Sequence, residues 1–230
     1  MSKLIYVGKT KDVYDNQDGT YTLKLKDDAT GKDGVFDPGE NSVGLQIEGI
    51  GRESLRVSKY YFEKLKDSGI PTHYVDSDLE EVTMKVKPVT PFGEGVEFIC
   101  RCKADGSFLR RYGGYATFGL DLDYFVEVTL KDDERQDPPI NKDALVRLKI
   151  MTEVEYETCK NLTVQATKLI EEDLNEKGLT LFDLKFEFGL YNGEVLLIDE
   201  ISAGCMRVYK DGVKVPPLEL GKYILLRNGQ

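Results

Sequence analysis

The sequence predicts an α+β fold with two lobes, each rich in antiparallel sheet. Short segments in which apolar and polar residues alternate recur along the chain, as in the strands of half-buried sheets. Two longer segments instead carry the period of an amphipathic helix, one in each half of the chain. Alternating strands grouped in this order with a few helices are typical of α+β proteins.

The N-terminal segments favour an antiparallel meander. Residues 4–7 are predicted to form a short strand, and residues 20–26 alternate as the strand that returns. Between them, Lys9 and Lys11 lie two positions apart on extended chain, so both ammonium groups can reach one polyanion. A solvated strand face explains the same two lysines. Residues 26–34 are polar and contain glycine, and we expect a loop there.

The boundary between the lobes is predicted from a change in local composition. Residues 54–68 have a helical period, and residues 82–89 alternate as a strand. Residues 88–93 follow with two prolines and a glycine, and such a stiff, turn-rich segment suits a hinge. We therefore expect an N-terminal lobe of residues 1–88 and a C-terminal lobe of residues 89–230.

A basic cluster opens the second lobe. Residues 96–103 alternate as a strand, and residues 104–114 are predicted to form a loop of small residues. Ser107, flanked by Arg101 and Arg111, suits a phosphate that is held by hydroxyl, guanidinium and backbone N–H donors. A charged hairpin end explains these residues equally well, and both interpretations stay open.

Capping residues mark the remaining helices. Asn141 is expected to cap a short helix. Residues 152–177 are predicted to form the longest helix, because Thr152 and Glu155 make a capping box at its start. Near the C-terminus, residues 223–226 are mostly apolar, and we expect an edge strand there.

A hairpin after this helix carries most of the charged residues of interest. Residues 181–189 alternate strictly, with phenylalanine and leucine on one face and Asp183, Lys185 and Glu187 on the other. An Asn-Gly pair at residues 192–193 and a second apolar run follow. This pattern predicts two antiparallel strands joined by a tight turn.

The length of the turn decides where Asp199 lies. A two-residue turn at residues 192–193 would put Asp199 on the apolar face and bury a carboxylate among phenylalanines. A three-residue loop at residues 191–193 reverses the parity and puts Asp199 across from Lys185, with Glu187 within roughly 5 to 8 Å. Burying an uncompensated carboxylate costs several kcal/mol, so we predict the three-residue loop.

The polar face of this hairpin allows two interpretations. Outer faces of strands routinely carry solvated charges. In the functional interpretation, Glu187 and Asp199 hold a divalent cation through hard oxygen ligands, and Lys185 lies near the same anionic ligand. Residues 201–207 favour the second interpretation, because a loop of small residues that ends at Arg207 suits an anion.

The charge balance limits the possible partners. The 230 residues include 31 basic and 41 acidic side chains, for a net charge of −10. General binding to nucleic acid or to an anionic membrane depends on basic side chains, so we expect neither. Any phosphate site must then be a local basic cluster. No segment approaches about 18 uninterrupted apolar residues, and no apolar signal region opens the chain, so we expect a cytoplasmic protein.

Cysteine and histidine chemistry is not expected. The four cysteines have neither metal-ligand spacing nor the pattern of a disulfide framework, so we expect buried thiols in a reducing compartment. His73 is the single histidine. A lone histidine is more often structural than catalytic, which disfavours a histidine base and a histidine-bound zinc.

Taken together, lysines for phosphates, carboxylates for magnesium and a second basic pocket describe a nucleotide site. At this level the sequence resembles the SAICAR synthetases, the phosphoribosylaminoimidazole-succinocarboxamide synthases of purine biosynthesis. The matching pieces follow the family's order over about residues 3–209. They are Gly-Lys-Thr-Lys-Asp-Val-Tyr at 8–14, residues 28–33, residues 64–72, Arg101 with Gly-Ser-Phe-Leu-Arg-Arg-Tyr-Gly-Gly at 106–114, Lys-Asp-Asp at 131–133 with Asp-Pro at 137–138, and Asp-Leu-Lys-Phe-Glu-Phe-Gly at 183–189 with Asp-Glu at 199–200.

The resemblance implies a reaction and a set of roles. It implies that L-aspartate is ligated to the carboxylate of carboxyaminoimidazole ribonucleotide while ATP is cleaved to ADP and phosphate. The implied fold is related to ATP-grasp enzymes, with a nucleotide cleft between an ATP-binding N-terminal lobe and a C-terminal lobe. The implied roles are Lys9 and Lys11 for ATP phosphates, Glu187 and Asp199 for magnesium, Arg101, Ser107, Arg207 and Asp137 for substrate, and Lys185 and Asp33 at the reaction centre.

Two departures from the family and two rival functions accompany this expectation. Ser202-Ala203-Gly204 stands where the family usually has Ser-Pro-Asp, and the C-terminal region is shorter. The first rival is another ATP-dependent carboxylate–amine ligase or kinase on the same scaffold. The second is a non-catalytic regulator that binds a nucleotide. The assembly is left open, with a homodimer as one option.

Overall fold

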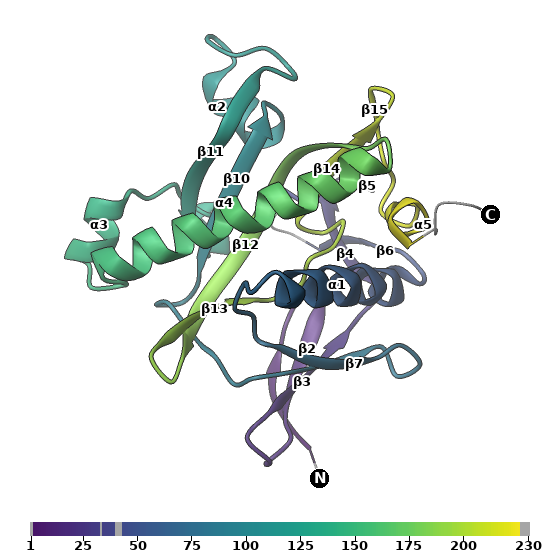
Figure 1. The fold of residues 1–230 in the computed structure, drawn as a ribbon, viewed down its shortest axis with the longest axis vertical. Helices are drawn as coiled ribbons and strands as arrows, with labels where there is room; N and C mark the ends of the chain where they lie inside the picture. The colour runs from purple at the N-terminus through teal and green to yellow at the C-terminus, as the bar shows by residue number, and fades with distance from the viewer. Residues whose placement is uncertain (1, 33, 40–42, 226–230) are drawn as a thin grey trace.

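The computed structural model describes residues 2–32, 34–39 and 43–225. Its strands form antiparallel sheets that are joined and covered by helices (Figure 1), so the predicted α+β class is confirmed. One sheet has the order β1 (Lys3–Val7), β2 (Lys11–Asp15), β3 (Tyr21–Leu25), β8 (Thr83–Val86) and β7 (Tyr74–Asp78). A small sheet beside it has the order β5 (Val35–Phe36), β4 (Asp28–Lys32) and β6 (Val43–Gln46).

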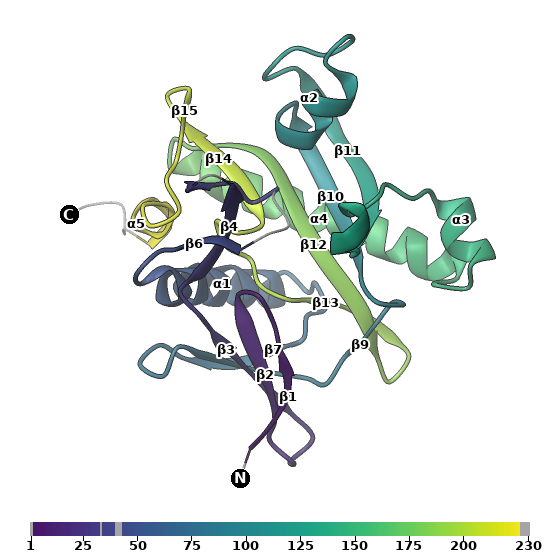
Figure 2. The ribbon, with the colours of Figure 1, turned by 180° about the vertical axis from the view of Figure 1, so that it is seen from behind.

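The second large sheet is built around its longest strand, β12 (Thr180–Tyr191) (Figure 2). Its order is β11 (Asp121–Leu130), β10 (Val96–Lys103), β12, β14 (Met206–Lys210) and β15 (Val213–Lys214), and β12 also pairs with β13 (Glu194–Ile198) and β9 (Thr90–Pro91). The apolar face of β12 is buried: Leu184, Phe186 and Phe188 are each at most 2% exposed. The predicted alternation is therefore confirmed from Asp183 to Phe188, whereas at Phe182 the register of β12 against β14 shifts.

Helices cover the apolar faces of both large sheets. Helix α4 (Glu153–Glu176) lies across β10, β11 and β12, while α1 (Ile50–Asp67) packs on β3 and β7 and touches α4 (Figure 1). The short helices are α2 (Gly106–Tyr112), α3 (Lys142–Arg147) and α5 (Leu220–Leu225), with a 3₁₀ turn at Asp133–Arg135. Both predicted caps are confirmed: Asn141 accepts from the Ala144 N–H at 2.9 Å, and Thr152 with Glu155 forms the capping box of α4.

The two large sheets are joined by backbone hydrogen bonds and by helix packing, among other contacts. Residue Thr72 bridges Leu197 in parallel, and the His73 N–H donates to the Leu197 carbonyl at 2.9 Å, which ties the start of β7 to β13. Helix α5 comes from the C-terminal end of the chain and packs on α1. The first sheet ends at β8 and the second begins at β9. The division into lobes at residue 88 stays a prediction, as does a nucleotide cleft between them.

Three local expectations were wrong. The predicted loop at residues 26–34 contains β4, which pairs with β5 and β6. The predicted loop at residues 104–114 contains α2, because the Asp105 carboxylate accepts from the Gly106 N–H and opens a helix. The predicted edge strand at residues 223–226 falls on α5 as far as it is described. Pairing with distant strands decides β4, whereas a local cap that the loop prediction overlooked starts α2.

The predicted three-residue loop of the β12–β13 hairpin was also wrong. Tyr191 pairs with Glu194, which leaves a two-residue turn at Asn192 and Gly193. Both turn residues have positive φ, 52° and 82°, as a type I′ turn requires. The Asn-Gly pair therefore determined the turn, and the argument from the buried carboxylate failed.

Asp199 escapes the apolar face by a local backbone change. Strand β13 ends at Ile198, and Asp199 takes a left-handed φ of 71°, so the alternation of the strand stops before it. Its carboxylate then forms an ion pair with Lys11 on β2. The carboxylate is only 18% exposed but has a cation as its partner, so the cost that disfavoured this register does not arise.

The cysteines and the helices of the described residues bear on two further expectations. The four cysteines are free and buried, as predicted. None of the helices described is long and apolar enough to cross a membrane.

Candidate functional site

The polar face of the second large sheet carries a row of buried charges. In the strand register Arg101 pairs with Asp183, and Asp183 pairs with Arg207, so three strands place these side chains in one line. The Asp183 carboxylate accepts from the Nη1 atoms of both arginines at 2.9 Å. Asp183 is 3% exposed and Arg101 is 1% exposed. The interpretation of this face as a solvated surface was therefore wrong.

The residues expected to bind a substrate phosphate lie together in this row. Arg101 Nη2 donates to the Ser107 hydroxyl at 2.8 Å, and Arg101 Nε donates to Glu127 at 2.6 Å. Arg207 Nη2 donates to Asp37 at 2.8 Å. Burial opposes the charge of Arg207, but the Asp183 and Asp37 carboxylates outweigh it and raise its pKa. Two guanidinium groups and a hydroxyl thus converge in a cluster that we call the arginine site.

Two glycines make room for Arg207. A Cβ atom added at Gly106 would lie 2.6 Å from the guanidinium carbon of Arg207, and one added at Gly39 would lie 2.4 Å from its Nη2. Gly106 also has a φ of +54°. Backbone from the segment before β6 and from the start of α2 therefore lies so close to the guanidinium that a side chain would not fit at either glycine.

A second cluster, which we call the lysine–carboxylate cluster, lies farther along β12. Lys11 forms an ion pair with Asp199 and lies 3.6 Å from the Glu200 carboxylate. Burial alone would lower the pKa of Lys11, but the two carboxylates raise it, so this lysine stays charged. For Asp199, burial alone would raise the pKa, and Lys11 outweighs burial and lowers it.

Lys185 and Glu187 complete the lysine–carboxylate cluster. Lys185 Nζ donates to Glu97 at 2.6 Å, and Lys131 Nζ donates to Glu187 at 2.8 Å. Glu97 and Glu187 face each other across β10 and β12, so each carboxylate needs its own lysine. Burial opposes the charge of Lys185, but Glu97 and Glu187 raise its pKa.

Glu187 and Asp199 act on each other electrostatically. Burial and the charge of Asp199 together raise the pKa of Glu187. Two carboxylates that repel each other in a buried place are a fitting pair of ligands for a hard divalent cation. Residues 2–32, 34–39 and 43–225 hold no group of three or more His, Cys, Asp or Glu side chains placed around one metal position. Further ligands would have to come from the bound substrate or water.

The other predicted residues are placed as follows. Lys9 lies two residues before Lys11 in the chain. It forms an ion pair with Asp133, and both side chains of this pair are exposed. The Asp137 carboxylate accepts from the Asp132 N–H at 2.7 Å, and its pKa is raised by burial and by the charge of Glu97. Asp33 lies outside the described residues.

Several residues of the site were not predicted. Each pairs with a residue that was predicted: Asp183 with Arg101, Glu97 with Lys185, and Lys131 with Glu187. The alternation of residues 181–189 had already placed Asp183 on the polar face, so a signal for it existed. Asp37 gave no local signal, because its hydrogen-bond partner Arg207 lies 170 positions later in the chain.

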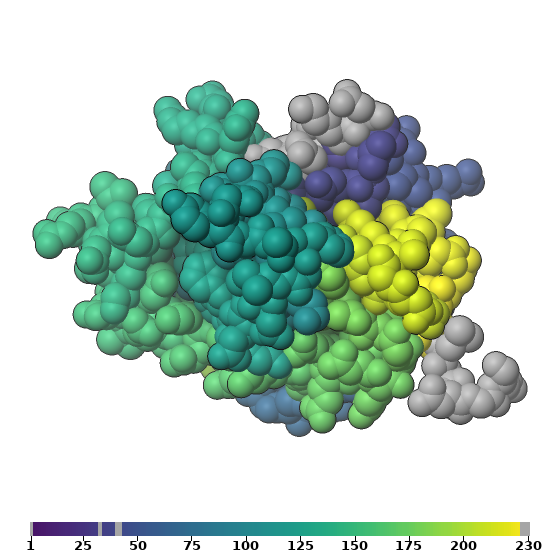
Figure 3. Space-filling view, turned by 90° about the horizontal axis from the view of Figure 1, so that it is seen from above, coloured from purple at the N-terminus to yellow at the C-terminus, as the bar shows by residue number. Residues whose placement is uncertain are grey.

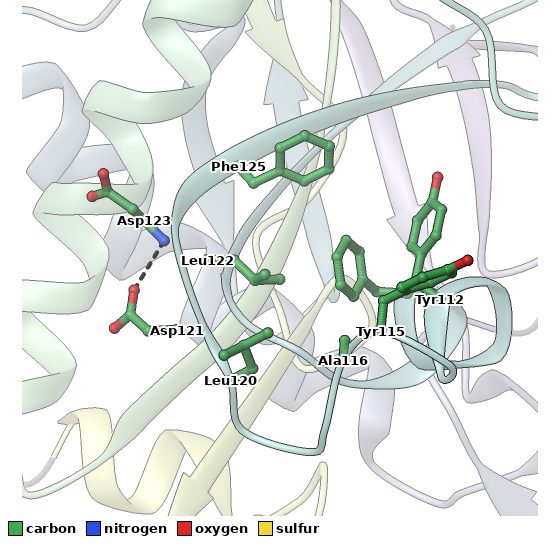
Figure 4. Close-up of a pocket in the computed structure, with 9 residues that line it drawn as sticks. Tyr112, Tyr115, Ala116, Leu120, Asp121, Leu122, Asp123 and Phe125 are labelled. Carbon is green, nitrogen blue, oxygen red and sulfur yellow. Dashed lines mark hydrogen bonds between the residues drawn. The ribbon is translucent and has the colours of Figure 1, made fainter.

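An apolar cavity adjoins the arginine site through Phe108, whose ring centroid lies 5.7 Å from the Arg101 guanidinium carbon. It has a volume of about 620 Å³ and lies between α2 and β11. In Figure 4 the rings of Tyr112, Tyr115 and Phe125 line it, whereas the carboxylates of Asp121 and Asp123 point away from it. It offers no charged group to a phosphate, so we do not assign it to the reaction centre.

His73 supports the backbone of Asp199, in keeping with the structural role predicted for it. Its Nε2 lies 3.0 Å from the Asp199 carbonyl, so the neutral ring must donate there. Burial lowers the pKa of His73 to about 4. The folded state therefore resists a protonation that the unfolded chain accepts near pH 6.5.

We expect the unfolding free energy to fall as pH falls from 6.5 to 4. The expected loss due to His73 is about 3 kcal/mol, because stability is lost where the unfolded chain binds the extra proton. Urea unfolding across this range should show the loss in the wild type and a smaller one in His73→Gln, which keeps a donor but does not titrate. Equal pH slopes for the two proteins would contradict the assignment.

Comparison with known proteins agrees with this arrangement. The family model described as SAICAR synthetase matches residues 4–220. A phosphoribosylaminoimidazole-succinocarboxamide synthase of Clostridium tetani is 57% identical, over 96% of this chain and 99% of its own.

Solved structures extend the likeness to the fold. One SAICAR synthetase superposes with a TM-score of 0.79 at 34% identity, over 90% of this chain and 86% of that one. A second, described as a type-2 SAICAR synthetase in complex with ADP, gives a TM-score of 0.80 at 27% identity, over 91% and 85%. The family model covers both charged clusters of β12, and the chain belongs to the SAICAR synthetase family.

Proposed function

We propose that this protein ligates L-aspartate to the carboxylate of carboxyaminoimidazole ribonucleotide and cleaves ATP to ADP and phosphate. The observation that carries the proposal is the arrangement on β12. Asp183 holds the arginine site, and Lys185 and Glu187, two and four residues on, belong to the lysine–carboxylate cluster. One strand thus presents a site for a phosphate beside a site for a nucleotide and its metal.

The lysines would bind the triphosphate. Lys11 is a partly buried cation, 18% exposed, that pairs with Asp199, and Lys9, two residues earlier in the chain, is 42% exposed. Both can donate to phosphate oxygens, and Lys11 does so without losing a proton, because the Asp199 and Glu200 carboxylates favour its charged form. The type-2 relative in complex with ADP supports ATP as the nucleotide.

Glu187 and Asp199 would hold magnesium. Both offer hard oxygen atoms, and a cation between them would offset the repulsion that raises the pKa of Glu187. When bound, magnesium would neutralise charge on the ATP phosphates. Lys185 would stand at the reaction centre with Asp33, and its ammonium would stabilise the negative charge that builds up on the substrate carboxylate.

The chemistry follows from the nature of the substrate. A carboxylate is a poor electrophile, so transfer of the ATP γ-phosphoryl group to it would give an acyl phosphate, which the aspartate amine can attack. Positioning and charge neutralisation supply the catalysis, and no histidine base is needed. Arg101, Ser107 and Arg207 would hold the phosphate of the ribonucleotide, and Asp137, near Glu97 and Lys185, would contact the substrate.

The setting of the enzyme is part of the proposal. The substrates are small molecules, and a net charge of −10 disfavours nucleic acid as a partner. We place the protein in the cytoplasm, with no membrane partner, and take a homodimer as the assembly to test.

The deciding experiment is an ADP-release assay in which each substrate is omitted in turn. The proposal predicts release only when both aspartate and the ribonucleotide are present with ATP and magnesium. Release with a different acceptor would favour another ligase or a kinase on this scaffold. ATP binding without release under any condition would favour a regulator.

The packing of Arg207 leads to a further prediction. We expect Gly106→Ala to raise the KM for the ribonucleotide at least about tenfold, because the new methyl group would push the guanidinium from its position. The KM for ATP should change little. Gly114→Ala is the matched control, since a Cβ there meets nothing within 4 Å. Equal effects of the two substitutions would show that Arg207 does not bind the ribonucleotide.

A further inference from the structure

A lysine outside the predicted set faces the arginine site. Lys214 lies on β15 and pairs with Tyr209 on β14. Directly paired residues of antiparallel strands project to the same face, and Arg207 lies two residues before Tyr209 on that face as well. The Tyr209 hydroxyl donates to Asp105 at 2.7 Å, and Arg207 Nε lies 3.8 Å from the same carboxylate. The β14–β15 hairpin thus brings Lys214 to the arginine site.

Views of the whole molecule agree with this placement. The β14–β15 hairpin and α2 stand at the same end of the molecule in Figures 1 and 2. In the space-filling view of Figure 3 their surfaces meet. A ligand bound beside α2 can therefore reach the hairpin.

Charges of both signs surround Lys214: the carboxylates of Asp37, Asp105 and Asp183 and the guanidinium of Arg207 all act on it. Its ammonium forms no hydrogen bond or ion pair within the described residues, and among the charges that act on it those of Asp37 and Arg207 have the largest effects. Burial lowers its pKa, Asp37 opposes that shift, and Arg207 adds to it. A half-buried ammonium that faces a second cation without a partner of its own is stabilised by any anion that enters between them.

Asp37 shows which kind of group fits this place. Its carboxylate accepts from Arg207 Nη2 at 2.8 Å. Of the carboxylates that act on Lys214, it has the largest effect on the pKa of that lysine. An oxyanion can therefore lie against Arg207 and within the field of Lys214 at the same time. A phosphate group has more oxygen atoms than a carboxylate and more charge, so it can contact both cations and the Ser107 hydroxyl.

We infer that Lys214 is a third cation of the arginine site and binds the phosphate group of the ligand together with Arg101 and Arg207. This inference rests on the proposed function only for the identity of the ligand, since the chemistry it names is that of a phosphate monoester. It adds a binding residue from the β14–β15 hairpin to the arginine site.

Inorganic phosphate tests the inference without any turnover. We expect millimolar phosphate to raise the Tm of the wild type, because a ligand that binds only the folded state stabilises it. Lys214→Gln should lose most of that rise, and Lys214→Arg should keep it. Lys210→Gln is the matched control, because Lys210 is on the same hairpin but lies 5.4 Å from the Tyr223 ring centroid on the other face.

Kinetics provide the second readout. Lys214→Gln should raise the KM for the ribonucleotide about 10- to 100-fold, as expected for a lost charged hydrogen bond, with the KM for ATP and kcat unchanged. A phosphate-dependent Tm rise in Lys214→Gln equal to that of the wild type would overturn the inference, and so would a wild type without any rise. If the rise depends on Lys214 but no ADP is released, the inference stands and the proposed ligase function fails.

Discussion

Asp199→Asn is expected to lower kcat at least about a thousandfold. The substitution removes one of the two proposed magnesium ligands and the anion that holds Lys11, which together should cost at least about 4 kcal/mol of transition-state stabilisation. Asparagine is chosen because residue 199 has a φ of 71°, and asparagine tolerates the left-handed region better than alanine. The backbone that positions the loop should therefore survive.

The measurement is steady-state ADP release with magnesium in excess. Asp211→Asn is the matched control, because Asp211 also has a positive φ, 50°, but lies exposed in the turn between β14 and β15. Lys11 keeps Glu200 at 3.6 Å in the variant, so we expect urea unfolding to show a folded protein of reduced stability. A folded Asp199→Asn protein with kcat within tenfold of the wild type would remove Asp199 from the metal site.

Lys185→Met is expected to lower kcat by a similar factor, at least about a thousandfold, while ATP still binds. The substitution removes the ammonium that faces the reacting carboxylate and leaves Glu97 opposite Glu187 without its own cation. Methionine keeps the length and the packing of the lysine stem. Calorimetric titration with an ATP analogue and ADP-release kinetics separate binding from turnover.

This substitution also separates an enzyme from a regulator. A regulator that only binds a nucleotide would tolerate Lys185→Met, whereas a ligase would not. Lys103→Met is the control, since Lys103 lies on the neighbouring strand β10 and forms only a partly exposed ion pair with Asp121, at 3.7 Å. Retained ligase activity in Lys185→Met would place the reaction centre elsewhere.

The β12–β13 hairpin shows how far local patterns reach. The alternation of residues 181–189 correctly placed Asp183, Lys185 and Glu187 on one face, because side-chain direction in a strand depends only on position. The register failed because the energy of burying Asp199 was judged without its partner. Lys11 lies on another sheet, and no spacing in the sequence relates the two residues.

The arginine site shows the same limit. Arg101, Ser107 and Arg207 were expected to act together through the family resemblance, and they lie together in the structure. The carboxylates that hold them, Asp183 from the next strand and Asp37 from the first half of the chain, follow only from the three-dimensional arrangement. The predicted loop at residues 104–114 became α2 because one aspartate caps it, a choice that propensity alone leaves open.

The sequence by itself determined the periodic and capping features, the faces of β12, the charged residue types and the family, because these depend on neighbours along the chain. Only the tertiary structure decided which carboxylate meets which cation, and that the charged face of β12 is buried. The physical reason is that the free energy of a buried charge depends on its partner and on the surrounding dielectric, and both come from segments that are distant in sequence.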